Sequence, residues 1–405
     1  MYDWVVIWSW VEVAARWLHV TTAMAWIGTS FYFIALDLGL HRDRSLPEGV
    51  DGEEWQVHGG GFYHVQKYRI APPHMPSGLV WFKWESYATW LSGFVLLALV
   101  YYLGAEYYLI DPNVAALSRW QAIAISVGSL GLGWLAYNAL CKLFVNANQT
   151  HLMIGLFILL VAISWAYTQV FTGRAALLHL GAFTATLMSG NVFAIIIPNQ
   201  KIVVADLIAG REPDARYGKI AKQRSTHNNY LTLPVIFLML SNHYPLAFAS
   251  SANWLIAALI FLIGVTIRHW FNTRHARGGT PYWTWGATVI LFLLIAWLST
   301  APMFTQQSAA APQPRFASAD GFESVHQIVQ KRCAMCHAAA PVWAGLHWPP
   351  KAVILESAAQ VSLNARDIYL QAGISQAMPP ANVSNITAEE RAAIIAWYKA
   401  ATGRE

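Results

Sequence analysis

The chain has 405 residues, of which 56% are hydrophobic and only 12% carry a charge, about half the charged share of an average soluble protein. A soluble fold of this size could not bury so much apolar surface, so the composition excludes an ordinary soluble enzyme and favours a membrane protein. The net charge of +5 comes from a few basic loops and does not indicate nucleic-acid binding.

Apolar runs of about 18 residues or more recur along the chain, which is the length that a helix needs to cross a bilayer. Each run is predicted to be a helix, because a bilayer cannot hydrogen-bond an exposed backbone. The sequence therefore predicts an all-α, polytopic transmembrane helical bundle of about eight spans, at residues 10–38, 79–103, 120–145, 151–171, 176–198, 229–248, 252–271 and 282–302. The sixth span is the weakest, because it is short and contains Pro234 and Pro245.

Lysine and arginine gather in alternate loops between these spans, at residues 42–69, 201–224 and 268–277. Cytoplasmic loops carry such an excess of basic residues, so both termini are predicted to face outward. We therefore expect a multi-pass protein of a bacterial inner (cytoplasmic) membrane with both termini in the periplasm. The first span is too long for a signal peptide and lacks a small-residue cleavage site, so it is predicted to be retained.

Three stretches are more polar than membrane sequence requires. The first, HGGGFYHVQKYRIAPPH at 58–74, is glycine-rich and cationic, although topology alone also predicts a basic loop here. The second, MSGNVFAIIIPNQK at 188–201, places Asn191 inside a span, and the third is HNNYLTLPVIFLMLSNHYP at 227–245. We hypothesise that the three stretches converge in space.

One histidine lies well inside the first predicted span. His19 shares a helix face with Thr22, Trp26 and Ser30, which are spaced by about four residues. An ionisable side chain at such a depth marks a functional site by default. Its imidazole is expected either to hydrogen-bond a backbone carbonyl, to ligate a b-type haem or to touch a substrate.

The composition changes after Pro302. A small, polar and proline-containing stretch predicts a flexible linker at 304–320. The predicted domains are therefore a transmembrane domain at 1–303, this linker, and a soluble domain at 321–405.

The soluble domain contains KRCAMCH, in which Cys333 and Cys336 are followed at once by His337. C-x-x-C-H is the attachment signature of a c-type haem: the thiols form thioether links and the imidazole binds the iron. A disulfide between the two cysteines is the alternative. The predicted second axial ligand is Met378, which two prolines keep out of a helix, and His347 is its rival.

Two helices are expected to enclose this haem. The first begins at Phe322 and places Val325 and Val329 at helical spacing, and the second begins with a capping box of Thr387 and Glu390. With the haem signature and the Met-Pro-Pro loop, residues 321–405 resemble a class I cytochrome c.

The three polar stretches, WLHVTTAMAWIGTSFYF at 17–33 and the appended haem domain together resemble one family. It is the integral-membrane, cytochrome c-fused urate oxidases, or urate hydroxylases, of bacterial purine catabolism. The resemblance implies oxidation of urate to 5-hydroxyisourate, without hydrogen peroxide. It also implies that electrons pass to one covalent haem c and on to a respiratory cytochrome or terminal oxidase.

Urate is a planar anion at neutral pH, so its site is expected to offer cationic donors and a base with a pKa near neutrality. In the 58–74 stretch we expect Lys67 or Arg69 to clamp the anion and His64 or His58 to accept a proton.

Electron transfer raises a difficulty of distance, because the hydrocarbon core is about 30 Å thick. Either urate enters toward the outer half of the membrane, or a relay such as an additional haem b lies between, held by His19 with His179 or His243. Two other functions stay open. One is a membrane-anchored cytochrome subunit that oxidises a quinol or a partner dehydrogenase, and the other is a transporter or scaffold whose cytochrome senses redox state.

Overall fold

The computed structural model describes residues 4–42, 45–144, 149–301, 314–344, 346, 349–350 and 353–403. The chain divides into two compact units. The larger unit comprises Trp8–Asn242 and Leu246–Thr305, and the smaller one comprises Met1–Ile7, His243–Pro245 and Gln306–Glu405. The predicted boundaries of the linker stay a prediction, because most of 304–320 lies outside the described residues.

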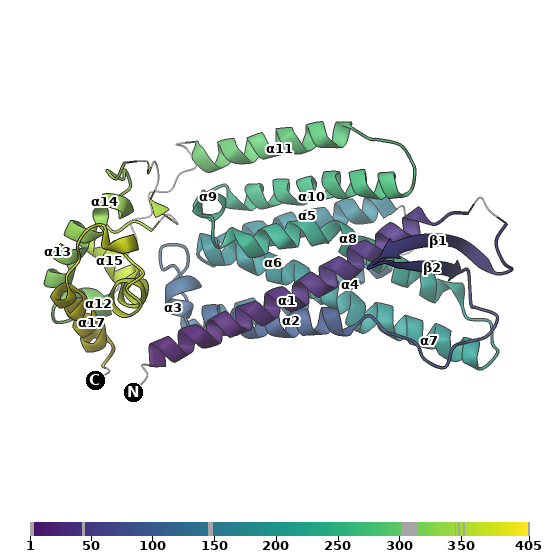
Figure 1. The fold of residues 1–405 in the computed structure, drawn as a ribbon, viewed down its shortest axis with the longest axis horizontal. Coiled ribbons are helices and arrows are strands. Elements are labelled where there is room, and N and C mark those ends of the chain that lie inside the picture. Colours follow the sequence, from purple (N-terminus) through teal and green to yellow (C-terminus); the bar gives the residue numbers. More distant parts are fainter. Residues whose placement is uncertain are drawn as a thin grey trace. The chain divides into compact units, whose positions relative to one another are not determined.

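The larger unit is a helical bundle with a small hairpin. In Figure 1 its long helices lie alongside one another, and the hairpin lies at one end of them. Its elements are α1 (Trp4–Gly39), β1 (Val50–His58), β2 (Gly61–Tyr68), α2 (Trp84–Leu97), η1 (Ala98–Tyr102), α3 (Ala105–Tyr108), α4 (Arg119–Leu143), α5 (Gln149–Thr168), α6 (Gly173–Gly190), η2 (Asn191–Ile196), α7 (Ile197–Ile208), α8 (Ala215–Ser241), α9 (Pro245–Phe248), α10 (Asn253–His275) and α11 (Trp283–Thr300).

All eight predicted spans fall on helical segments, but only some of these segments suit a bilayer. Five described helices are long and apolar enough to cross one: α4, α5, the continuous α6–η2–α7 segment, α10 and α11. The tryptophans and threonines of α1 lower its hydropathy, α2 ends after 14 residues, and the first half of α8 is polar. The structure is therefore compatible with a membrane protein, and eight spans stay a prediction.

The hairpin is the departure from an all-α fold among the described residues. Strands β1 and β2 pair antiparallel, with His58 opposite Gly61. Gly59 and Gly60 form the turn with φ of +58° and +80°, a conformation that glycine adopts without steric cost and that suits the twist of a two-residue hairpin turn. The Gly-Gly pair in the 58–74 stretch is thus a turn signal.

Close helix packing in the larger unit depends on small residues. A Cβ atom on Gly133 of α4 would lie 1.9 Å from the ring of Phe183 in α6. Pro234 interrupts the backbone hydrogen bonding of α8, and its ring fits against Gly264 of α10, where a Cβ would lie 2.5 Å away. Helix α8 is consequently held between α6 and α10.

The smaller unit is built from short helices. Trp397 is 1% exposed, and its ring contacts those of Phe316 and Phe322, with centroids 5.8 and 5.9 Å away. Its elements are α12 (Pro314–Ala317), α13 (Phe322–Arg332), α14 (Ala334–His337), α15 (Ala358–Leu363), α16 (Ala365–Ile368), η4 (Tyr369–Ile374), η5 (Pro380–Asn382) and α17 (Ala388–Thr402). Helices α13 and α17 pack together, as the sequence predicted.

The predicted capping box at the start of α17 is confirmed. Thr387 Oγ1 accepts a hydrogen bond from the Glu390 amide, and Glu390 Oε2 accepts one from the Thr387 amide at 2.8 Å. The same carboxylate accepts from Arg332 Nε of α13 at 3.0 Å. One side chain therefore both caps α17 and ties it to α13.

We predict that Thr387→Ala lowers the free energy of unfolding of the smaller unit by about 1 kcal/mol, because an N-cap hydroxyl is lost. The measurement is the urea concentration at which residues 321–403 become susceptible to protease in the purified chain. Thr387→Ser keeps the hydroxyl and should match the parent protein. Equal midpoints for the alanine and serine variants would contradict the role of the cap.

Candidate functional site

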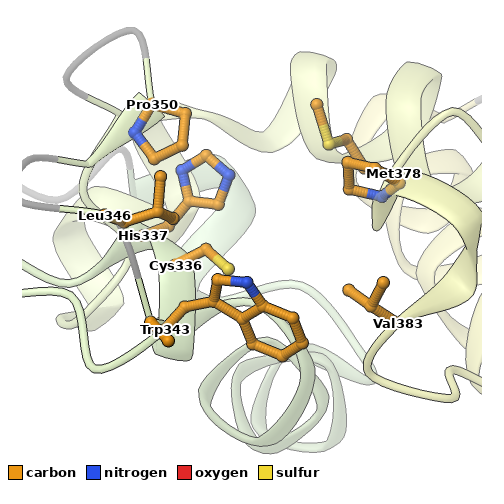
Figure 2. Close-up of a pocket in the computed structure, with 9 residues that line it drawn as sticks. Cys336, His337, Trp343, Leu346, Pro350, Met378 and Val383 are labelled. Atoms are coloured by element: carbon orange, nitrogen blue, oxygen red, sulfur yellow. The ribbon is translucent and has the colours of Figure 1, made fainter.

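The smaller unit contains a cavity of about 350 Å³ beside the C-x-x-C-H sequence. Figure 2 shows the imidazole of His337 on one wall and Met378 on the facing wall, with Cys336 and Trp343 beside them. The lining is largely apolar and consists of Cys336, His337, Trp343, Ala344, Leu346, Pro350, Met378, Pro380 and Val383.

Local structure fixes the orientation of His337. Helix α13 ends at Arg332 and the single turn α14 follows, so that Cys336 and His337 leave the same turn. His337 Nδ1 donates a hydrogen bond to the carbonyl oxygen of Val353 at 2.9 Å. A proton on Nδ1 leaves Nε2 as the basic nitrogen, and this arrangement is typical of a histidine that ligates a metal.

Both cysteines of the signature carry free thiols in this structure, so the disulfide alternative is not what the geometry shows. Burial raises the pKa of the Cys333 thiol to about 11, with the neighbouring Cys336 as a smaller cause. Burial also raises the pKa of Cys336. Both sulfurs are therefore neutral thiols at pH 7.

The loop that carries Met378 is anchored through its backbone. Arg391 of α17 donates from Nη1 to the carbonyl oxygens of Met378, at 2.9 Å, and of Ala372. The Met378 amide donates to the Gln371 carbonyl oxygen at 2.9 Å. Met378 lies outside any helix, as the prolines after it predicted, whereas the rival ligand His347 lies outside the described residues.

These residues fit a c-type haem. The cavity offers an apolar lining, one imidazole and one thioether on facing walls, and the Cys336 thiol beside the imidazole. No group of three or more His, Cys, Asp or Glu side chains that could hold a free metal ion occurs in the described ranges. A haem iron needs fewer protein ligands than a free metal ion does, because the porphyrin supplies its other ligands.

The four residues expected to handle urate lie on or next to the hairpin. His64 Nε2 is 2.8 Å from Glu53 Oε2, and its ring stacks on Trp55 with centroids 4.3 Å apart. His58 ends β1 and is exposed. Arg69 lies just after β2, and its Nε is 3.8 Å from a carboxylate oxygen of Asp51 in β1.

Lys67 of β2 forms an ion pair with Asp37 at the end of α1. Lys222 of α8 approaches the same carboxylate at 3.5 Å. Burial lowers the pKa of Lys67, and repulsion from Lys222 lowers it further. Three of the four predicted residues thus already face a carboxylate, which competes with an anionic substrate. Their catalytic roles stay a prediction.

His19 lies at the contact between α1 and α2. Its Nδ1 is 3.1 Å from the Thr89 carbonyl oxygen and 3.2 Å from Ser92 Oγ. A Cβ on Gly93 would lie 2.8 Å from the imidazole, so this glycine makes room for the ring. The carbonyl bond is one of the roles expected for His19.

His179 is one of the two histidines expected to hold a haem b together with His19, but its surroundings leave little room for a porphyrin. That side chain is 0% exposed, and the rings of Tyr101, Tyr167 and Phe171 surround it at centroid distances of 4.8–6.1 Å. A porphyrin needs an open face beside the ligating nitrogen, which His179 does not provide. The additional haem b stays an expectation, with His243 as the other partner that the sequence offers.

A buried polar cluster in the larger unit joins two of the three polar stretches. We call it the Arg224 cluster. It consists of Tyr137 and Asn138 of α4, Asn191 of η2, and Arg224, His227 and Asn228 of α8. The hypothesis of convergence therefore holds for the second and third stretches, whereas the first forms the hairpin.

Hydrogen bonds connect the members of this cluster. Arg224 donates from Nη1 to Asn191 Oδ1 at 3.2 Å and from Nη2 to Asn138 Oδ1 at 2.7 Å. Its guanidinium lies 4.9 Å from the centre of the Tyr137 ring. The Tyr137 hydroxyl is 2.7 Å from His227 Nδ1 and accepts from Asn191 Nδ2 at 2.9 Å.

Arg224 was not predicted as a site residue, because it lies among the basic residues of 201–224 that set topology. A usable signal is nevertheless present. Arg224, His227 and Asn228 are spaced by three and four residues, which places them on one face of α8.

Comparison with known proteins identifies one family model that matches, described as urate oxidase N-terminal, over residues 5–299. The match covers nearly the whole larger unit and does not include the C-x-x-C-H sequence. No curated protein and no solved structure matches the chain.

We predict that Cys333→Ala combined with Cys336→Ala abolishes covalent haem. Both thioether links are then impossible, so a haem stain of the denatured chain on a gel should be blank. Cys141→Ala removes the buried cysteine of α4 and should leave the stain unchanged. A parent chain that carries no haem after expression with c-type maturation would contradict the assignment.

Proposed function

Since the chain belongs to the urate oxidase N-terminal family, we propose that it is a membrane-bound oxidoreductase that converts urate to 5-hydroxyisourate and passes the electrons to a haem c on the same chain. The observation that supports this proposal is that one polypeptide contains both the family match at 5–299 and the pocket lined by Cys336, His337 and Met378.

The reaction requires an electron acceptor and a source of oxygen. Urate takes up one water molecule, forms a new C–O bond at a central carbon, and releases two electrons and two protons. A bound c-type haem supplies one-electron acceptance. Because the electrons leave through the chain, dioxygen is not needed as the oxidant and hydrogen peroxide does not form.

The residues of the smaller unit would hold this haem in defined roles. Cys333 and Cys336 would provide the thioether links, and His337 Nε2 and the Met378 sulfur would be the protein ligands of the iron. The Val353 carbonyl oxygen keeps the His337 proton on Nδ1, and Arg391 holds the Met378 loop.

The larger unit is proposed to lie in a bacterial inner membrane. Five helices suit a bilayer, and the basic loops between predicted spans favour both termini and the haem domain on the periplasmic side. On this arrangement the electrons continue to a respiratory cytochrome or terminal oxidase. Eight spans are proposed in place of five, with α1, the α2–η1 segment and α8 completing the bundle.

We predict that urate reduces the haem of the purified chain without oxygen. The measurement is the absorbance spectrum of the reduced c-type haem after anaerobic addition of urate. The variant with both Cys333→Ala and Cys336→Ala should show no such change. A haem that a quinol reduces and urate does not would assign the chain to quinol oxidation and contradict the proposal.

We further predict that Met378→Leu lowers the reduction potential of the haem, because a thioether ligand raises it. A redox titration monitored by the haem spectrum measures this. Met335→Leu, which changes the methionine between the two cysteines, is the matched control and should leave the potential near that of the parent. Equal potentials for the Met378→Leu variant and the parent would show that Met378 is not a ligand.

A further inference from the structure

We infer that the Arg224 cluster, and not the hairpin, binds the urate anion in the larger unit. This inference rests on the proposed function and deepens it by naming the groups that would receive the substrate. It depends on a buried charge, on buried donors without acceptors, and on an irregular helix turn at the same place.

The first observation is a positive charge in the interior. Arg224 is 2% exposed, and among the described residues no carboxylate lies within ion-pair distance of its guanidinium. Its Nη atoms donate to the neutral amides of Asn138 and Asn191. A buried charge is normally paired or bound to an ion of the opposite sign. The site therefore favours an anionic ligand.

The second observation is the hydrogen-bond polarity of His227. The Tyr137 hydroxyl accepts from Asn191 Nδ2, which leaves its own proton for His227 Nδ1, 2.7 Å away. An imidazole that accepts at Nδ1 carries its proton on Nε2 when it is neutral. His227 is 1% exposed, and this Nε2–H is buried without an acceptor in the described part of the chain.

Two further buried N–H groups lack an acceptor there: Nε of Arg224 and Nε1 of Trp134. Trp134 precedes Tyr137 by three residues on α4, and its Nε1 would lie 2.0 Å from a Cβ on Gly190, directly before Asn191. These buried groups of the cluster that lack a hydrogen-bond partner are thus donors. Urate presents carbonyl oxygens and a delocalised negative charge, which accept such bonds.

The third observation is the backbone at Asn191. Helix α6 passes into the π-helical turn η2 at this residue before α7 continues. Single π-helical turns inside an α-helix occur frequently at functional sites. Here the irregular turn presents the Asn191 side chain to Arg224 and Tyr137.

The cluster also offers aromatic surfaces to a planar substrate. The indole of Trp134 and the ring of Tyr137 provide aromatic surfaces for stacking. Asn138, Asn228 and Trp134 are half-buried, so the edge of the cluster is within reach of solvent although Arg224 and His227 are not. By contrast, the basic groups at Lys67 and Arg69 of the hairpin region already face Asp37 and Asp51.

The test is equilibrium binding of radiolabelled urate to the purified full chain whose haem has been chemically reduced beforehand, so that urate is bound and not consumed. Arg224→Gln removes the buried charge and should weaken binding by about 10- to 100-fold, the range expected for a lost hydrogen bond to a charged group. Arg216→Gln, on the same helix but exposed and paired with Asp214, should bind urate like the parent.

Trp134→Phe is a second test, and it stays informative if the Arg224→Gln variant does not fold. It keeps an aromatic ring on α4, removes the N–H donor, and should weaken urate binding by about 5- to 10-fold. The thermal unfolding midpoint and the haem content of each variant are measured alongside, to separate loss of binding from loss of fold.

The outcomes separate this inference from the proposed function. If the parent chain neither binds nor oxidises urate, the proposed function fails. If the parent oxidises urate but the Trp134→Phe variant binds urate as tightly as the parent does, the inference alone is overturned. The same holds if a folded Arg224→Gln variant binds urate as tightly as the parent. Loss of binding confined to His64→Ala would place the substrate at the hairpin and overturn it as well.

Discussion

The guanidinium of Arg224 constrains the larger unit, because it is a buried charge held by neutral partners. Its bonds join α8 to Asn138 of α4 and to Asn191 of η2, so three segments far apart in sequence meet at one side chain. Removing a charge from water costs several kcal/mol even after relaxation. A fold that retains this arrangement gains a place where a negatively charged, flat molecule would be stabilised.

The same reasoning explains why the hairpin is the weaker candidate. His64, Lys67 and Arg69 are basic, but each lies beside a carboxylate. A substrate anion would have to displace Glu53, Asp37 or Asp51 from them. The charge count of a loop therefore does not indicate an anion site unless the partners of those charges are known.

Much of the architecture could be predicted from sequence because its causes are local. Runs of apolar residues predicted the helices, Thr387 and Glu390 predicted the cap of α17, and the spacing of Phe322, Val325 and Val329 predicted α13. The hairpin was not predicted, because the 58–74 stretch was interpreted as a glycine-rich basic loop and the turn at Gly59 and Gly60 was not recognised. The Arg224 cluster was missed because its acceptors lie on α4 and η2, at sequence separations of 86 and 33 residues.

Under the proposed function, joining the urate-oxidising unit to its acceptor in one chain has a physical advantage. A tethered acceptor is present at a fixed ratio and at a high effective concentration. The most direct test of this account is an anaerobic titration of the purified chain with urate, followed by the absorbance of the c-type haem. Because urate gives two electrons and a haem takes one, about half an equivalent of urate per chain should reduce all of the haem. A haem that stays oxidised while urate is consumed in air with release of hydrogen peroxide would contradict it.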